Sequence, residues 1–270
     1  PPSFPTSLDS TKSKGSSLRP ENDPPSPLPK FSYIERKGAL DVRCSFVDIV
    51  HGLFSAESGV FATLIILECQ FNTLKQPRRF QSVDISLEFR GMQPEETGPQ
   101  VYAIAPDGKS SLMLTTRDVE LKQSASLQLG SATPFGGATA TLAARWEKSV
   151  SRDTSDEVTL MGSIHLIGRN WGKPNCASWT LLENPITNTG VPTSLRTAIL
   201  LMRKNKDRFQ CVVKIHTKVD FASAVENIFK SRNLSAPILF DPEMKPTNNL
   251  REYDVEGLGS LDLDSLTTVL

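Results

Sequence analysis

The sequence predicts a mostly β protein: an antiparallel β-sandwich of the jelly-roll type, with one short helix near the C-terminus and extended terminal arms. Three observations favour this class. Alternating apolar and polar residues recur along the middle of the chain, and turn signals separate these segments. Helical spacing of apolar residues occurs only in residues 220–232, where Asp220 or Ser223 would cap the helix. The first 30 residues are rich in proline and serine, as extended chain is.

The predicted domain spans residues 31–240, and its first clear strand is the apolar segment 60–75. Residues 79–90 then alternate strictly, which predicts a strand with one buried and one exposed face. We expect the buried set to be Val83, Ile85, Leu87 and Phe89, and the exposed set to be Asp84, Ser86 and Glu88. The intervening QPRR would close an antiparallel hairpin.

Further segments bring the number of predicted strands to at least eight. Residues 101–104 and 112–116 flank the turn signal APDGKSS, and a second hairpin would form around RKNKD from residues 193–202 and 208–219. The other strand patterns are residues 118–130, 136–150 and 156–168. Such spacing is typical of a double-layered β-structure.

Residues 168–185, GRNWGKPNCASWTLLENP, combine two tryptophans with loop-forming residues. We expect an irregular loop followed by a strand that Pro185 ends. Trp171 and Trp179 are interpreted as core side chains at one end of the sandwich, together with Trp146. The alternative is a ligand loop formed by Trp171, Asn175 and Trp179, although the sequence does not place the convergent polar groups that such a pocket needs.

Both ends of the chain are predicted to form extended arms. Residues 1–30 form either a flexible tail or an arm that becomes ordered on a neighbouring subunit. Residues 241–270 form an acidic tail with seven acidic and two basic residues, a net charge of −5. This tail either stays in solvent or docks in a groove of a partner. The predicted docking side chains of the two arms are Phe4, Leu18, Leu28, Leu261 and Leu263.

Composition and motifs exclude several classes of function. Thirty basic residues balance thirty acidic ones, so no global charge attracts nucleic acid. The longest apolar run, residues 60–67, falls far short of the roughly 20 residues of a membrane helix, so no membrane partner is expected. We find no nucleophile motif, no phosphate-binding glycine loop and only scattered histidines (His51, His165, His216). We therefore expect no enzyme, no catalytic residues and no cofactor.

The cysteines and the N-terminus point to an intracellular protein. Cys44, Cys69, Cys176 and Cys211 lie far apart without a metal-ligand spacing, so no metal site is expected. We expect them to be reduced and buried rather than joined in two disulfides. The first residues have neither the charged nor the apolar region of a signal peptide. Together with the resemblance described next, these features predict the cytoplasm of a fungal host, or a virion surface, as the location.

Two stretches, WEKSVSRDTSDEVTLMGSI and GRNWGKPNCASWTLLENPITNTGVPTSLRTAILLMRK, carry a resemblance. Over roughly Val101 to Val219 the chain resembles uncharacterised proteins of filamentous ascomycete fungi. The resemblance implies a fungal setting, as a host protein or as a gene exchanged with a fungal virus, and it carries over no catalytic residues. The chain also looks like the accessory proteins on capsids of double-stranded RNA mycoviruses, such as the crown proteins of megabirnaviruses.

The leading functional prediction is a non-enzymatic structural or interaction protein. In it, the β-sandwich docks through its arms on other protein subunits, either copies of itself or a capsid-like shell, as a homo-oligomer or part of a symmetric assembly. The alternative is a carbohydrate- or lipid-binding module of a fungal cell, and an enzyme ranks third.

Overall fold

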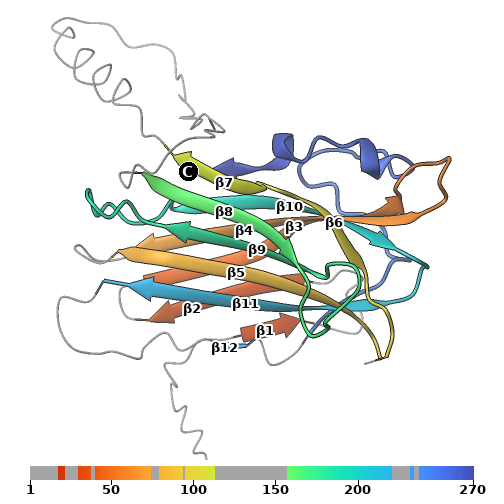
Figure 1. The fold of residues 1–270 in the computed structure, drawn as a ribbon, viewed down its shortest axis with the longest axis horizontal. Coiled ribbons are helices and arrows are strands. Elements are labelled where there is room, and N and C mark those ends of the chain that lie inside the picture. Colours follow the sequence, from red (N-terminus) through yellow and green to blue (C-terminus); the bar gives the residue numbers. More distant parts are fainter. Residues whose placement is uncertain are drawn as a thin grey trace, which may run out of the picture.

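Two antiparallel sheets stacked face to face form the protein and confirm the predicted mostly-β sandwich (Figure 1). The computed structural model describes residues 18–21, 30–37, 40–73, 79–93, 95–112, 157–220, 232–233 and 237–270. The helices among these residues are two short 3₁₀ turns, η1 (Leu258–Ser260) and η2 (Asp264–Leu266). Figure 1 shows the C-terminal segment in blue along the top of the view.

Each sheet has seven strands. The first sheet runs in the order β1 (Leu18–Glu21), β2 (Lys30–Lys37), β3 (Leu40–Leu53), β4 (Phe61–Thr73), β10 (Ser194–Arg203) and β14 (Thr268–Val269), with β6 (Gln100–Ala105) also on β10. The second runs in the order β12 (Arg232–Asn233), β11 (Phe209–Val219), β5 (Phe80–Gly91), β9 (Cys176–Leu182), β8 (Val158–His165) and β7 (Gly108–Leu112), with β13 (Ile238–Phe240) also on β11.

The strands predicted to form hairpins lie in different sheets, so both predicted hairpins are wrong. β4 pairs with β3 and β10, whereas β5 pairs with β11 and β9. Likewise β10 belongs to the first sheet and β11 to the second. The chain thus passes from the first sheet to the second between β4 and β5, and again between β10 and β11. Alternation of apolar and polar residues indicates which face of a strand is buried, but it does not indicate which strand lies beside it. The hairpins were predicted because the strands are neighbours in the sequence, and this criterion failed here.

The face pattern of β5 agrees with the prediction for the buried set and for Asp84, whereas Ser86, predicted to be exposed, is half-buried. Val83, Ile85, Leu87 and Phe89 are all buried, and Asp84 is exposed. Glu88, which was predicted to face solvent, is also buried. The cause lies outside the strand, in a loop that covers this part of the sheet, and it is described with the site below.

Aromatic side chains fill the space between the sheets. The rings of Phe209 and Phe240 stack with their centroids 4.8 Å apart, and Phe89 packs against both at 6.4 and 6.5 Å. Trp179 is fully buried in the same cluster, as its strand position predicted. Burying such rings is a large part of the free energy that holds the two layers together.

The C-terminal segment is not a free tail. Residues 241–270 pack on the outer face of the first sheet and form a second apolar cluster with β3, β4 and β10. In this cluster Leu258 is fully buried and Leu263 is 9% exposed, while Leu261 is partly buried. Leu261 and Leu263 therefore pack on their own domain, and their predicted docking on a partner stays a prediction. β4 explains this arrangement, since its residues 62–67 are buried on both faces and need a cover on each.

A disulfide joins Cys44 and Cys69, which lie directly opposite each other on β3 and β4. The expectation of four reduced cysteines is wrong for this pair, whereas Cys176 and Cys211 are free and buried. Sequence spacing could not reveal the pair because the register that brings the two residues together is a tertiary feature. Disulfides are typical of oxidising compartments, so the cysteines no longer support an intracellular location.

Several predictions concern residues outside the described part of the chain. They are Phe4, Leu28, Trp146, the strand patterns 118–130 and 136–150, and most of the predicted helix 220–232. Leu18 lies in β1, where its backbone is paired with that of Tyr33 in β2, so this part of the N-terminal arm is a strand of the chain's own sheet. Among the described residues, no helix has the length and apolar character to cross a membrane.

Candidate functional site

Three loops meet at one end of the sandwich, which we call the loop end. They connect β5 to β6 (residues 92–99), β8 to β9 (residues 166–175) and β10 to β11 (residues 204–208). The strand register brings them together, since Gly91 lies opposite Phe209 and Glu88 lies opposite Cys176. Three hollows lie among these loops and share wall residues.

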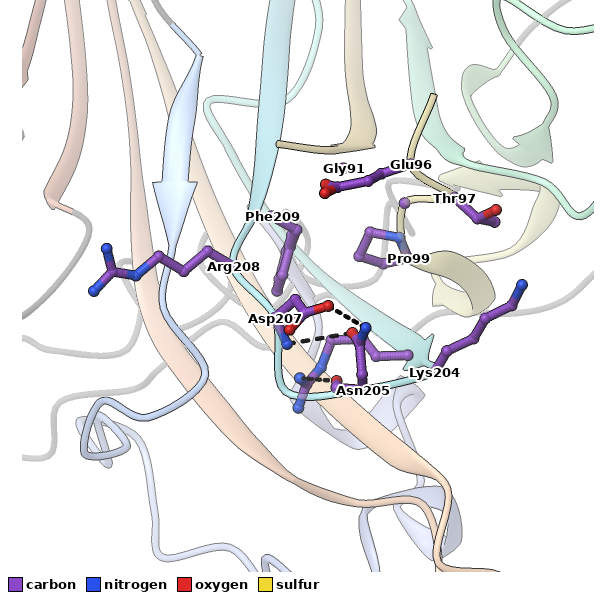
Figure 2. Close-up of a pocket in the computed structure, with 11 residues that line it drawn as sticks. Gly91, Glu96, Thr97, Pro99, Lys204, Asn205, Asp207, Arg208 and Phe209 are labelled. Carbon is purple, nitrogen blue, oxygen red and sulfur yellow. Dashed lines mark hydrogen bonds between the residues drawn. The ribbon is translucent and has the colours of Figure 1, made fainter. Parts of the chain in front are cut away.

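The hollow between residues 91–99 and 203–209 is the smallest, at about 200 Å³ (Figure 2). Its wall is occupied by internal hydrogen bonds: Arg203 Nη1 donates to the carbonyl of Asn205 at 2.9 Å, and the amide of Asn205 contacts Asp207. Arg208 points away from the hollow and forms an ion pair with Asp241 at 2.7 Å. We regard this hollow as structural.

The loop of residues 166–175 carries the largest exposed aromatic side chain of the described chain, Trp171, which is 85% exposed. Glycines flank it on the two sides, with φ values of 75° at Gly168 and 118° at Gly172. Side chains with a Cβ rarely adopt such values, so the two glycines permit the turns that carry Trp171 outward. The structure therefore corrects the interpretation of Trp171 as a core residue.

The hollow beside Trp171 is rich in positive charge. Its charged wall residues are Arg169, Lys173 and Lys204, and no carboxylate lines it. None of the three cations forms an ion pair with any described residue. We call this the basic hollow. Uncompensated cations in a concave site attract anionic groups, and guanidinium and ammonium groups bind phosphates and carboxylates with charge-assisted hydrogen bonds.

Asn175 holds the base of the Trp171 loop in place. Its side-chain Oδ1 accepts a hydrogen bond from the backbone N–H of Ile167 at 2.8 Å, and its Nδ2 donates to the carbonyl of Phe89 at 3.3 Å. The residue is only 3% exposed. Trp179, the third member of the predicted ligand loop, donates from Nε1 to the carbonyl of Pro106 at 2.9 Å in the core. The three predicted residues thus do not converge on one ligand site.

A third hollow lies between the other two, and its wall contains the buried side chain of Glu88. We call it the central hollow. Glu88 is buried because residues 166–168 fold over the outer face of β5; a Cβ on Gly168 would lie 3.9 Å from Glu88 Oε1. Oε1 accepts a hydrogen bond from Arg90 Nε at 2.7 Å. Oε2 lies 3.8 Å from Lys214 Nζ and accepts no hydrogen bond from the described residues.

Burial perturbs the two free cysteines and His51. Burial, with a smaller effect of nearby Glu88, raises the pKa of the Cys176 thiol to about 12, and burial also raises the pKa of Cys211. Burial and the charge of Arg203 lower the pKa of His51 to about 4. The described residues contain no group of three or more His, Cys, Asp or Glu side chains that could hold a metal ion.

Comparisons with known proteins add little. No family model matches the chain, and no curated protein matches it. Among solved structures, the chain is similar to Clostridium perfringens delta-toxin at 12% identity, over 79% of this chain and 90% of that chain, with a TM-score of 0.31. It is also similar to a protein described as a pore forming protein at 9% identity, over 78% and 87%, with a TM-score of 0.32. Values this low carry no argument about function, and the fungal or viral setting stays a prediction.

Proposed function

We propose that this chain is a non-enzymatic binding protein that docks its loop end on the headgroup layer of a phospholipid membrane. The observation that carries the proposal is the exposed Trp171 beside three unpaired cations in the basic hollow. The proposal develops the lipid-binding alternative of the sequence and departs from the expectation that the chain has no membrane partner.

An indole ring and basic side chains suit the boundary between water and lipid. Tryptophan is enriched at this boundary, where its ring meets the acyl region and its N–H stays hydrated. Burying such a ring stabilises by about 1.5–3 kcal/mol, and each basic residue near an anionic surface adds about 1 kcal/mol. Trp171 and the three cations would therefore contribute about 5 kcal/mol of binding free energy. This value corresponds to a dissociation constant between millimolar and micromolar. Binding to lipid should be weak and reversible for a single copy of the chain.

A carbohydrate is a poorer fit to the same residues. Sugar hydroxyls need several convergent hydrogen-bond acceptors around the aromatic ring. In the basic hollow the side chains with acceptor atoms are Asn170 and Thr97, whereas the three charged side chains are pure donors. Charged donors match phosphate oxygens better than neutral hydroxyls.

The predicted role of the arms in an assembly loses part of its support. Leu261 and Leu263 are packed on their own domain, and residues 18–21 pair within their own sheet. What is left of that prediction concerns residues outside the described chain. The loop end, in contrast, offers a described surface for a partner.

Co-sedimentation with vesicles of phosphatidylcholine that contain an anionic phospholipid tests the proposal, because the energy given for the three cations assumes a negatively charged surface. Trp171→Ala should abolish most of the binding and leave the melting temperature unchanged, because the side chain is 85% exposed. The matched control is Ile186→Ala, which removes a side chain 63% exposed in the loop after β9, at the opposite end of that strand. Ile186→Ala should bind like the wild type. The proposal fails if the wild type binds no phospholipid vesicle, or if both variants bind alike.

A further inference from the structure

We infer that the basic hollow recognises lipid headgroups that end in a phosphate monoester, such as that of phosphatidic acid, in preference to phosphodiester headgroups. This inference rests on the proposed function and deepens it by naming the headgroup. The observation behind it is the wall of the basic hollow, in which three accessible cations meet and which no carboxylate lines.

All three loops of the loop end contribute to the wall of the basic hollow. Arg169, Trp171 and Lys173 come from the loop between β8 and β9, Lys204 from the loop between β10 and β11, and Thr97 from the loop between β5 and β6. The hollow has a volume of about 590 Å³. Pockets for small ligands commonly measure about 300–1,000 Å³, so a lipid headgroup has room here.

The cations of the hollow are accessible to a ligand. Arg169, Lys173 and Lys204 are all exposed, and none of them is paired with a carboxylate of the described residues. The Arg169 guanidinium lies close to the loop backbone, since a Cβ on Gly172 would lie 4.0 Å from its Nη1. Gly172 follows Trp171 and precedes Lys173, so this guanidinium lies beside the same turn that carries the indole and one ammonium.

Three cations in one hollow suit a phosphate monoester better than a diester. A monoester carries a charge of about −1.5 to −2 at neutral pH, spread over three free oxygens. Arg169 can bind two of these oxygens in parallel through its fork of N–H donors, which leaves the third to Lys173 and Lys204. In a diester this third oxygen carries an alkyl group and no charge. The hollow therefore gains an additional charge-assisted contact from a monoester.

Trp171 places the hollow at the depth of the lipid phosphates. Interfacial indole rings lie at the level of the headgroups. Since Trp171 belongs to the wall of the basic hollow, insertion of its ring would bring the three cations to the same level. In phosphatidic acid no alcohol covers the phosphate, so all its free oxygens are open to the hollow.

A single methyl group on the lipid tests the inference without any mutation. Vesicles contain phosphatidylcholine with either phosphatidic acid or phosphatidylmethanol, in which a methyl group converts the monoester into a diester. The two mole fractions are adjusted to equal zeta potential, so that the general attraction of the surface is the same. Affinity for phosphatidic acid should be about tenfold higher, the effect of one charge-assisted hydrogen bond. Equal binding to the two vesicles would overturn the inference and leave membrane docking intact.

Arg169→Lys tests the fork of donors in the hollow. The substitution keeps the positive charge, but an ammonium cannot bind two phosphate oxygens in parallel, so the preference for phosphatidic acid should fall to about threefold or less. Arg208→Lys is the matched control and should keep the full preference. Arg208 also lies at the loop end, but it is no part of the wall of the basic hollow and pairs with Asp241 at 2.7 Å (Figure 2). An unchanged preference in Arg169→Lys would overturn the assignment of the monoester to this hollow.

Soluble ligands distinguish a lipid headgroup from a free phosphate ester. By calorimetry, glycerol 3-phosphate should bind about tenfold more tightly than its methyl ester, for the same reason as the lipid pair. It should bind more weakly than phosphatidic acid in vesicles, because it offers Trp171 no acyl region. If it binds as tightly as the lipid, the ligand is a soluble phosphate ester and the headgroup assignment is wrong. If the wild type binds neither kind of vesicle, the proposed function fails, and the soluble pair then decides whether the hollow prefers a monoester.

Discussion

Removing one hydroxyl from the C-terminal segment should measurably destabilise the whole domain. Tyr253 is 9% exposed, and its Oη donates a hydrogen bond of 2.8 Å to Oδ2 of the fully buried Asp48. The same carboxylate accepts hydrogen bonds from the backbone N–H groups of Asn249 at 2.6 Å and Leu250 at 3.1 Å. Asp48 on β3 thus fixes the start of the segment that covers the outer face of the first sheet.

Tyr253→Phe removes one of these three hydrogen bonds and retains the ring. A hydrogen bond to a charged group contributes about 1.5–3 kcal/mol, so the free energy of unfolding should fall by this amount. Burial and Asp48 both raise the pKa of Tyr253, so the hydroxyl stays a donor through the neutral range. Asp48 still accepts two hydrogen bonds in this variant. The loss of stability should therefore be smaller than the loss caused by an unpaired buried charge.

Urea denaturation measures the change as a lower midpoint with an unchanged slope. Tyr102→Phe is the control, because Tyr102 is 48% exposed and packs its ring on Phe54 at 4.8 Å. Its hydroxyl should contribute less than about 0.5 kcal/mol. Equal midpoints for the two variants would show that the bond to Asp48 does not anchor the segment.

Three further changes test the core, the disulfide and the half-buried His51. Phe89→Ala should lower the free energy of unfolding by about 3–5 kcal/mol in denaturant melts, since the ring is fully buried; a loss below 1 kcal/mol would contradict the packing. Replacing Cys44 and Cys69 by alanine should cost about 3.5 kcal/mol, because the disulfide spans 25 residues; an unchanged midpoint would contradict this. The pKa of His51 lies near 4 against an ordinary 6.5, so stability should be full above pH 6.5 and fall by at most about 3 kcal/mol as the pH drops through 4. His51→Gln should remove this dependence of stability on pH. If the variant keeps the wild-type pH profile, other groups cause the dependence.

The strands of this fold could be predicted from the sequence, but their partners could not. Alternation placed Val83, Ile85 and Leu87 on the core face of β5, as the structure has them. The pairing of β4 was missed because this strand is apolar on both sides, so that nothing local distinguishes a hairpin from a crossing between sheets. The disulfide and the cover formed by the C-terminal segment depend on that pairing and were missed with it.

The candidate site was only partly visible in the sequence. The tryptophans of residues 168–185 indicated a candidate site, and Gly168, Gly172 and Pro174 predicted the loop. The position at which β9 begins determines which tryptophan is buried in the core. Trp179 lies on the core face of β9, whereas Trp171 precedes the strand. Glu88 gave no signal, because a loop distant in sequence covers it. A position on the polar face of a strand predicts exposure only where no loop folds over that face.

The cations of the basic hollow differ from the charges beyond the far end of β9 in how they are satisfied, and this difference favours a ligand at the loop end. Beyond the far end of β9, Arg79 forms ion pairs with Glu183 at 2.8 Å and with Asp220. At the loop end, Lys173 and Lys204 have no such partner among the described residues, although the carboxylates of the central hollow lie nearby. Paired charges gain little from an external ion, whereas unpaired cations beside an exposed indole gain both contacts and charge neutralisation. If intramolecular pairing is what separates the two ends, binding to anionic vesicles should weaken with added salt, and Lys204→Gln should reduce that salt dependence. A salt-independent interaction would mean that Trp171 acts without the cations.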